Sequence, residues 1–301
     1  MAIPAVALPS RLSLAARIGA YVALTKPRII ELLLITTLPT MIVAQRGLPP
    51  VWLMVATLLG GTLAAGGANA INMYVDRDID SLMHRTRKRP LVTGAVTPRN
   101  ALAFAITLEV VAFVELWAWV NLLSAVLAVS ATLFYVFVYT LWLKRTSSQN
   151  IVIGGAAGAV PVLVGWAAVT DSLAWTPVVM FAIIFVWTPP HFWALAVKYK
   201  DDYQAAKVPM LPAVATFKRT AQEILVYSVV LVAVTLLLAY VASLGIIYVV
   251  AASVLGTVFI GLAARLWRRA TPKAAMQLFS YSITYLTLLF VCMAVDIFTK
   301  L

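Results

Sequence analysis

Apolar residues along this chain fall into long runs, and polar residues collect in the short gaps between the runs. Windows of ~19 residues separate nine runs that are each long enough to cross a bilayer as a helix. We expect these helices at 29–45, 51–74, 101–119, 122–142, 151–170, 174–197, 221–242, 245–265 and 276–297. The pattern therefore predicts an all-α polytopic membrane protein, with nine transmembrane helices in one bundle around a central cavity.

Composition leads to the same fold class. Of the 301 residues, 63% are hydrophobic and 11% are charged, whereas soluble domains carry roughly 25% charged residues. The mean hydropathy is +0.96. These values exclude a soluble globular protein and a disordered or fibrous chain. The single cysteine, Cys292, lies in an apolar run and cannot form a disulfide within the chain.

The basic residues predict the orientation. The chain has 23 Lys and Arg residues against 11 Asp and Glu residues, a net charge of +12. They form no continuous patch, which argues against nucleic acid as a partner. All of them except Arg46 and Lys300 lie in the N-terminal segment, or in or beside the gaps that follow even-numbered helices. The positive-inside rule then places the N-terminus in the cytoplasm.

Residues 1–28 precede the first apolar run and contain basic residues but no acidic ones. We expect them to form an amphipathic segment that lies on the membrane surface. A transit peptide for import into an organelle has the same basic, acid-poor composition and is the alternative. The intramembrane domain is then expected to extend over residues 29–301.

An acidic cluster directly follows the second apolar run. Asn72, Asp76 and Asp80 are spaced four residues apart, so on a helix they share one face, whereas Asp78 points away. Carboxylates aligned in this way repel one another, and a Mg²⁺ ion with one or two carboxylate ligands would relieve the repulsion. A solvated helix end, where Asp and Asn are common, is the alternative. We predict that Asn72, Asp76 and Asp80 bind a divalent metal ion.

A second charged cluster follows the sixth apolar run, with Lys198 and Asp202 four residues apart. Two basic runs, 84–89 and 144–146, are expected on the same side of the membrane. Each basic run alone is accounted for by the positive-inside rule. Together with the acidic clusters, they indicate a diphosphate held by metal ions and by Arg and Lys side chains. A diphosphate beside an apolar interior implies a polyprenyl tail buried between the helices.

Several segments resemble a known family. Residues 72–80 (NMYVDRDID) resemble the first aspartate motif of the UbiA-type intramembrane prenyltransferases. Longer segments resemble the protohaem IX farnesyltransferases, or haem O synthases, the haem-modifying branch of that superfamily: 24–29 (LTKPRI), 78–94 (DIDSLMHRTRKRPLVTG), 188–196 (TPPHFWALA) and 198–212 (KYKDDYQAAKVPMLP). The resemblance extends from about residue 24 to the C-terminus. Lys198 departs from the broader superfamily, which usually has Asp there; this puts a second fully acidic metal site in doubt but matches the haem-modifying branch.

The resemblance implies a nine-helix enzyme that transfers the farnesyl group of farnesyl diphosphate to the 2-vinyl group of haem B, a substrate rather than a permanent cofactor, to make haem O. It implies a catalytic set of Asn72, Asp76, Asp80, Lys198 and Asp202, in which all but Lys198 would hold Mg²⁺. The diphosphate would be neutralised by Arg28, Arg85, Arg89, Lys144, Arg145 and Lys198. The implied partners are the bilayer, a downstream haem A synthase and the terminal oxidase assembly. The membrane would be a bacterial inner (plasma) membrane, with the mitochondrial inner membrane as the alternative.

The chain has two histidines. His191 follows two prolines inside the sixth apolar run, and an ionisable residue at that depth indicates a function by default. With haem B as the implied substrate, we expect His191 to contact the haem iron. Alternatively, His191 caps the carbonyls that Pro189 and Pro190 leave free. His84 lies in the basic loop and is expected to contact a phosphate or a propionate rather than iron.

Two other function classes stay open. A prenyltransferase that acts on an aromatic quinone precursor would share the first acidic cluster, but it would have no need of segment 188–196 or of Lys198. A carrier for anionic metabolites would also have charged gaps, but it requires access from both faces of the membrane. Here the polar groups crowd on one side, which favours an enzyme.

Overall fold

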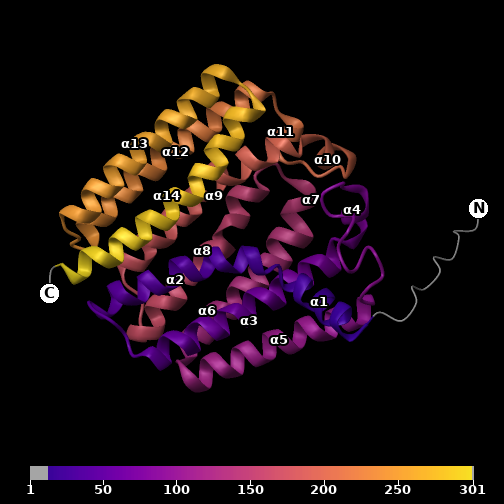
Figure 1. Ribbon diagram of the computed structural model, residues 1–301, viewed down its shortest axis with the longest axis horizontal. Coiled ribbons are helices and arrows are strands. Elements are labelled where there is room, and N and C mark those ends of the chain that lie inside the picture. Colours follow the sequence, from indigo (N-terminus) through magenta and orange to yellow (C-terminus); the bar gives the residue numbers. More distant parts are fainter. Residues whose placement is uncertain (1–12, 300–301) are drawn as a thin grey trace, which may run out of the picture.

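The computed structural model describes residues 13–299, apart from the side chains of residues 29, 32 and 33. Within residues 13–299 every regular element is a helix (Figure 1), which confirms the predicted all-α fold. Eight segments of this part are long and apolar enough to cross a membrane: α3 (Val51–Val75), α5 (Pro98–Trp119), the continuous α6 (Leu122–Leu133), η1 (Phe134–Leu143) and α7 (Lys144–Thr146), then α8 (Asn150–Thr170), α9 (Trp175–Lys198), α12 (Phe217–Val241), α13 (Ile246–Arg269) and α14 (Pro272–Phe298). The chain is an integral membrane protein.

The first predicted span corresponds to α2 (Pro27–Gln45), which has 19 residues. The longest continuous stretch of α2 with described side chains, Leu34–Gln45, is shorter than a membrane span, so the count of nine stays a prediction. Before it, α1 (Leu14–Thr25) packs against α3 and buries Leu24. The predicted N-terminal segment is therefore helical over 14–25, while residues 1–12 lie outside the described residues. The boundary at residue 28 stays a prediction.

The short helices gather at one end of the bundle. Figure 1 shows α4 (Arg77–Leu82), α10 (Lys200–Ala205) and α11 (Leu211–Val214) on the same side as α7. These helices follow even-numbered predicted spans, on the side where the charge distribution predicts the cytoplasm. The orientation itself stays a prediction.

Several helices begin before their apolar runs because polar residues cap them. The side chains of Thr97, Thr216 and Thr271 each accept a hydrogen bond from the backbone N–H three residues later. Pro98 and Pro272 then occupy the first helical position, where no N–H is needed. The caps extend α5, α12 and α14 by three or four residues beyond the runs predicted at 101, 221 and 276.

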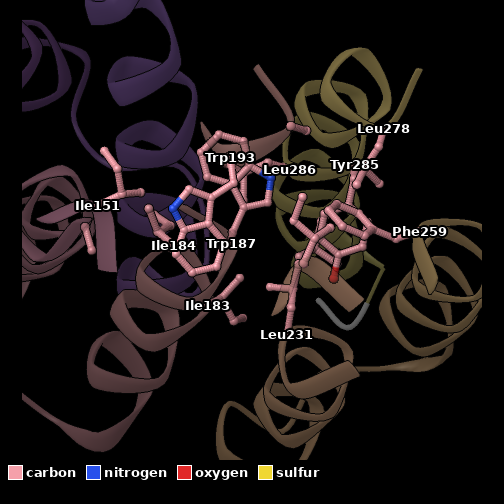
Figure 2. Packing of buried hydrophobic residues seen from close by; sticks show 14 of the residues in the cluster. Ile151, Ile183, Ile184, Trp187, Trp193, Leu231, Phe259, Leu278, Tyr285 and Leu286 are labelled. Atoms are coloured by element: carbon pink, nitrogen blue, oxygen red, sulfur yellow. The ribbon is translucent and has the colours of Figure 1, made fainter. Parts of the chain in front are cut away.

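The largest apolar cluster joins α9 to α12, α13 and α14. Figure 2 shows Trp187 and Trp193 of α9 beside Leu286 of α14. Phe259 of α13 meets the ring of Tyr285 edge to face, with ring centres 5.0 Å apart. Lipid tails are as apolar as these side chains, so close packing rather than expulsion of water holds the helices together.

Two glycines let α3 approach α5. A Cβ at Gly67 would lie 2.6 Å from Glu109 Oε1, and a Cβ at Gly60 would collide with the Glu115 carboxylate. Glu109 also accepts a hydrogen bond from the Thr132 hydroxyl at 3.2 Å. The small residues at these two positions therefore serve helix packing.

A buried carboxylate joins the last two helices at the opposite end of the bundle. Asp296 of α14 is 1% exposed. It accepts hydrogen bonds from the N–H groups of Gly245 and Tyr248 at the start of α13. Asp296 thus acts as an N-cap supplied by another helix, and its charge faces the positive end of the α13 dipole.

Candidate active site

Asn72, Asp76 and Asp80, here called the triad, lie together as predicted, although α3 does not continue through them. α3 ends at Val75, and Asp76 (φ −83°, ψ 1°) joins it to α4. The Asp76 N–H donates to the Asn72 carbonyl (2.9 Å) and the Asp80 N–H donates to the Asp76 carbonyl (2.8 Å), so the four-residue spacing is kept. The three residues are 3%, 0% and 2% exposed. The triad is therefore a buried polar cluster and not a solvated helix end.

Lys144 and Arg145 of α7 supply positive charge beside the triad. Lys144 Nζ forms an ion pair with Asp76 Oδ2, and Arg145 Nη2 lies 3.8 Å from Asp76 Oδ1. The Arg145 guanidinium also binds both oxygens of Asp78, at 2.7 and 2.8 Å. These hydrogen bonds lower the pKa of Asp78 to about 2. Asp78 is exposed and points away from the triad, as predicted.

Asp80 is held by the loop that follows α4, residues 83–97. Arg89 Nη1 lies 2.6 Å from Asp80 Oδ2. The Thr86 hydroxyl donates to the Asp80 carbonyl at 2.9 Å. The loop thus folds back over the end of α4 and brings a predicted diphosphate ligand, Arg89, onto a predicted metal ligand.

Asp202 of α10 binds the same loop. Its carboxylate accepts the backbone N–H groups of His84 (3.2 Å) and Arg85 (3.1 Å). The Arg85 guanidinium and the Lys198 ammonium lie 5.3 and 5.6 Å from the centre of the Tyr199 ring. The structure therefore brings the two charged clusters to one loop. Lys198 and Asp202 form no ion pair with each other within residues 13–299.

Lys26 is a site residue that the charge pattern did not single out. It lies between α1 and α2 with a left-handed φ of 53°. Its ammonium donates to Asn72 Oδ1 at 2.8 Å, and Asn72 Nδ2 donates to Asp76 Oδ2 at 2.8 Å. Burial lowers the pKa of Lys26 well below its ordinary value. The sequence signal that could have pointed to Lys26 was its position in segment 24–29, which resembles the haem-modifying branch.

Arg28 lies two residues further along, at the start of α2. It is exposed and forms no ion pair within residues 13–299. The structure therefore does not bring Arg28 to the triad, and its predicted contact with diphosphate stays a prediction.

The donor set of the triad fits a magnesium ion. Asp76 Oδ1 is buried and has no hydrogen-bond partner, and carboxylate and amide oxygens are the hard ligands that Mg²⁺ prefers. No group of three or more His, Cys, Asp or Glu side chains comes together as a complete metal site in the described part of the chain. A metal ion at the triad would therefore take much of its shell from water and from substrate phosphates.

An apolar cavity of about 290 Å³ lies in the bundle beside the triad, and its presence agrees with the predicted central cavity. Asn69, one turn before Asn72, belongs to its wall. Small side chains form much of the wall, including those at Gly61 and Gly158, where a Cβ would meet nothing within 4 Å. α2, α3, α6, η1, α8 and α9 all contribute to the lining.

The segment η1 is a π-helix between the cavity and Lys144. The Thr140 hydroxyl donates to the Tyr135 carbonyl five residues earlier (2.8 Å) and accepts a hydrogen bond from Asn72 Nδ2 (3.1 Å). The rings of Tyr135 and Tyr139 stack at 5.3 Å and line the cavity. π-Helical turns are rare and often mark functional sites. Here the wider turn places Thr140 against the triad.

His191 does not line the cavity, although Thr188 and Phe192 on either side of it do. It faces α14, where its Nδ1 lies 2.7 Å from Ser282 Oγ. Within the described residues His191 makes no hydrogen bond to the carbonyls near Pro189 and Pro190. His84 is exposed in the basic loop, near the charged clusters rather than the cavity.

Comparisons with known proteins show the family of this chain. Residues 33–291 match the model of the UbiA prenyltransferase family. A protoheme IX farnesyltransferase of Renibacterium salmoninarum is 52% identical, covering 96% of this chain and 93% of its own. One of Streptomyces avermitilis is 54% identical, covering 95% of each chain.

Among solved structures, a UbiA homolog from Archaeoglobus fulgidus, bound to GPP and Mg²⁺, has the same fold. The two structures compare with a TM-score of 0.64 and a sequence identity of 17%, and the match covers 91% of this chain and 99% of that one. The family match and the identity to these relatives lead to one conclusion. The chain belongs to the UbiA prenyltransferase family, and within it to the group of relatives named protoheme IX farnesyltransferase.

Proposed function

We propose that this enzyme transfers the farnesyl group of farnesyl diphosphate to the 2-vinyl group of haem B, making haem O and releasing diphosphate. The observation that carries the proposal is the buried triad directly beside an apolar cavity, which suits a substrate with an anionic head and an apolar tail. The names of the relatives support the choice of donor and acceptor. The proposed location is a bacterial plasma membrane. There the product would be passed to a haem A synthase and then to the terminal oxidase assembly.

The anionic head would bind at the triad. Asn72, Asp76 and Asp80 would hold Mg²⁺, as the buried Asp76 oxygen without a hydrogen-bond partner supports. Asp202 can join them, because each of its carboxylate oxygens keeps a free lone pair beyond the N–H bond that it accepts. A bound Mg²⁺ would neutralise charge on the leaving diphosphate. The relative from Archaeoglobus fulgidus, which binds GPP and Mg²⁺, supports this assignment.

Basic side chains would bind the remaining diphosphate oxygens. Lys26, Arg89 and Lys144 each contact a triad oxygen, so each would be placed to bind a phosphate held at the triad. Arg85 and Lys198 lie at the rim, over Tyr199. Positive charge placed before the reaction stabilises the diphosphate as the allylic C–O bond breaks.

The chemistry then needs no protein nucleophile. The C–O bond breaks and leaves its electron pair on the diphosphate, and the vinyl carbon of haem B attacks the allylic cation. Water adds a hydroxyl group to the neighbouring carbon and releases a proton. The cavity of about 290 Å³, just below the 300–1,000 Å³ range of ligand pockets, would hold the farnesyl tail and keep other water from the cation.

Haem B would approach beside α9 and α14. His191 lies seven residues before Lys198, ~10 Å below the charged clusters at 1.5 Å per residue. We propose that its free ring nitrogen binds the haem iron, while His84 contacts a phosphate or a propionate. In this arrangement the macrocycle lies in the hydrocarbon and its vinyl group points toward the triad.

The test uses purified protein with farnesyl diphosphate, Mg²⁺ and either haem B or an aromatic quinone precursor. We expect a product with the mass of haem O from haem B, and loss of that product when the metal is chelated. A prenylated phenol with no product from haem B would overturn the proposal in favour of a quinone-directed enzyme.

A further inference from the structure

Ser282 of α14 binds two aromatic residues of α9. The Trp187 indole N–H donates to the Ser282 carbonyl at 2.9 Å, and His191 Nδ1 lies 2.7 Å from Ser282 Oγ. The two rings are one helical turn apart and stack at 4.1 Å with an angle of 19° between their planes. Phe279 contacts the His191 ring at 4.8 Å. One fully buried serine therefore sets the position of the histidine ring.

The hydrogen bonds around Ser282 favour one position for the imidazole proton. A serine hydroxyl has one proton, and Ser282 Oγ donates it to the Phe279 carbonyl at 2.6 Å. With that proton given to the Phe279 carbonyl, Ser282 Oγ accepts in its contact with His191, which corresponds to the Nδ1–H tautomer of the imidazole. In a neutral imidazole with Nδ1–H, the other nitrogen, Nε2, carries a lone pair and no proton.

Nε2 of His191 has no hydrogen-bond partner within residues 13–299, and it is not among the fully buried unpartnered atoms. An unprotonated imidazole nitrogen with a free lone pair can bind iron. Histidines that bind metals usually donate their second N–H to an oxygen acceptor, which orients the ring and raises its basicity. Ser282 supplies such an acceptor.

We propose that Ser282 is a positioning residue for the haem substrate: it holds His191 as the Nδ1–H tautomer and directs Nε2 to the iron. This inference rests on the proposed function, because it takes haem B as the acceptor. It adds a residue of α14, distant in sequence from every predicted motif, to the acceptor site.

The experiment titrates haem B into purified full-length protein and follows the Soret band. Ser282→Ala removes the acceptor, and we expect haem to bind about 10- to 100-fold more weakly, the usual cost of losing such a partner. Ser282→Thr keeps a hydroxyl and should recover much of the affinity. Trp187→Phe is the matched control: it removes the other bond to Ser282 but keeps an aromatic ring at the position that stacks on His191. It should lower the melting temperature with little change in the Soret maximum.

Three outcomes separate the possibilities. If folded Ser282→Ala keeps the Soret maximum and the haem affinity of the wild-type protein, the inference is overturned. An unchanged spectrum in His191→Ala would also overturn it. Weaker haem binding in Ser282→Ala, with normal binding of farnesyl diphosphate, supports it. The proposed function is judged separately by the product masses from the wild-type protein, so its failure would not be mistaken for failure of the Ser282 assignment.

Discussion

Lys144 forms an ion pair with Asp76 across 68 positions of the chain, and Asp76 is fully buried. Burying a charge costs free energy unless a partner of opposite charge compensates it. Lys144 provides this compensation for Asp76. The pair joins the end of α3 to α7 and places a cation at the first carboxylate of the triad.

Loss of a triad carboxylate should stop turnover. We expect Asp76→Ala or Asp80→Ala to lower kcat by about 100-fold or more, the scale for removing a group that stabilises developing charge. Haem binding should persist, because only the diphosphate end of the site loses its cation. The measurement is haem O formation at saturating Mg²⁺, with Asp78→Ala as the control, since Asp78 faces away and should have a far milder effect. Near-normal rates in Asp76→Ala would refute the metal assignment.

Lys26 should contribute to binding of farnesyl diphosphate. Hydrogen bonds to charged groups contribute about 1.5–3 kcal/mol, so Lys26→Met should raise the KM for farnesyl diphosphate roughly tenfold or more. The affinity for haem B should not change. Lys26→Arg should restore part of the loss. Arg77→Met is the control, because the Arg77 side chain turns away to the Tyr74 carbonyl; equal effects of the two Met variants would argue against a specific role.

A substitution at Lys198 tests whether the residue typical of the haem-modifying branch is needed for activity. Lys198→Asp would restore the acidic pair of the wider superfamily but would replace a cation beside Tyr199 and Arg85 with a carboxylate. We expect activity to fall because diphosphate binds less well, seen as weaker binding of inorganic diphosphate in calorimetry. Lys200→Asp makes the same charge change on an exposed neighbour. Full activity in Lys198→Asp would leave Lys198 with a role in topology alone.

Asp296 should matter for stability rather than chemistry. Asp296→Ala leaves the N–H groups of Gly245 and Tyr248 without their buried acceptor, at a cost of about 1–3 kcal/mol. Thermal unfolding in detergent should show a lower Tm, while turnover of the folded protein stays unchanged. Asp201→Ala, at an exposed position, should leave the Tm as it is. An unchanged Tm in Asp296→Ala would contradict the capping role.

The contact between Asp78 and Arg145 should depend on pH. The folded pKa of Asp78, about 2, lies below its ordinary value of 3.8. The stabilising contribution is therefore complete above about pH 4 and is lost as the pH falls toward 2. Asp78 is exposed, so the effect is small. Unfolding of wild type and Asp78→Asn, compared from pH 5 to pH 2, should show a wild-type advantage that disappears at the acidic end.

Local patterns in the sequence were enough to predict the helices and the shared face of Asn72, Asp76 and Asp80. Apolar length determines which segments can cross a bilayer, and a four-residue spacing determines which side chains align, whatever the rest of the chain does. The break between α3 and α4 did not alter that face, because the backbone hydrogen bonds continue through Asp76.

Only the tertiary structure decided which residues meet across the bundle. Lys26 contacts Asn72, Asp202 binds the loop at His84, and His191 faces Ser282 rather than the cavity. Each of these contacts joins residues far apart in sequence, and each depends on which helices pack together and at what rotation. Helix packing in a membrane follows from shape, such as the glycines that admit α5 against α3, and periodicity along one helix carries no information about the neighbour that covers it.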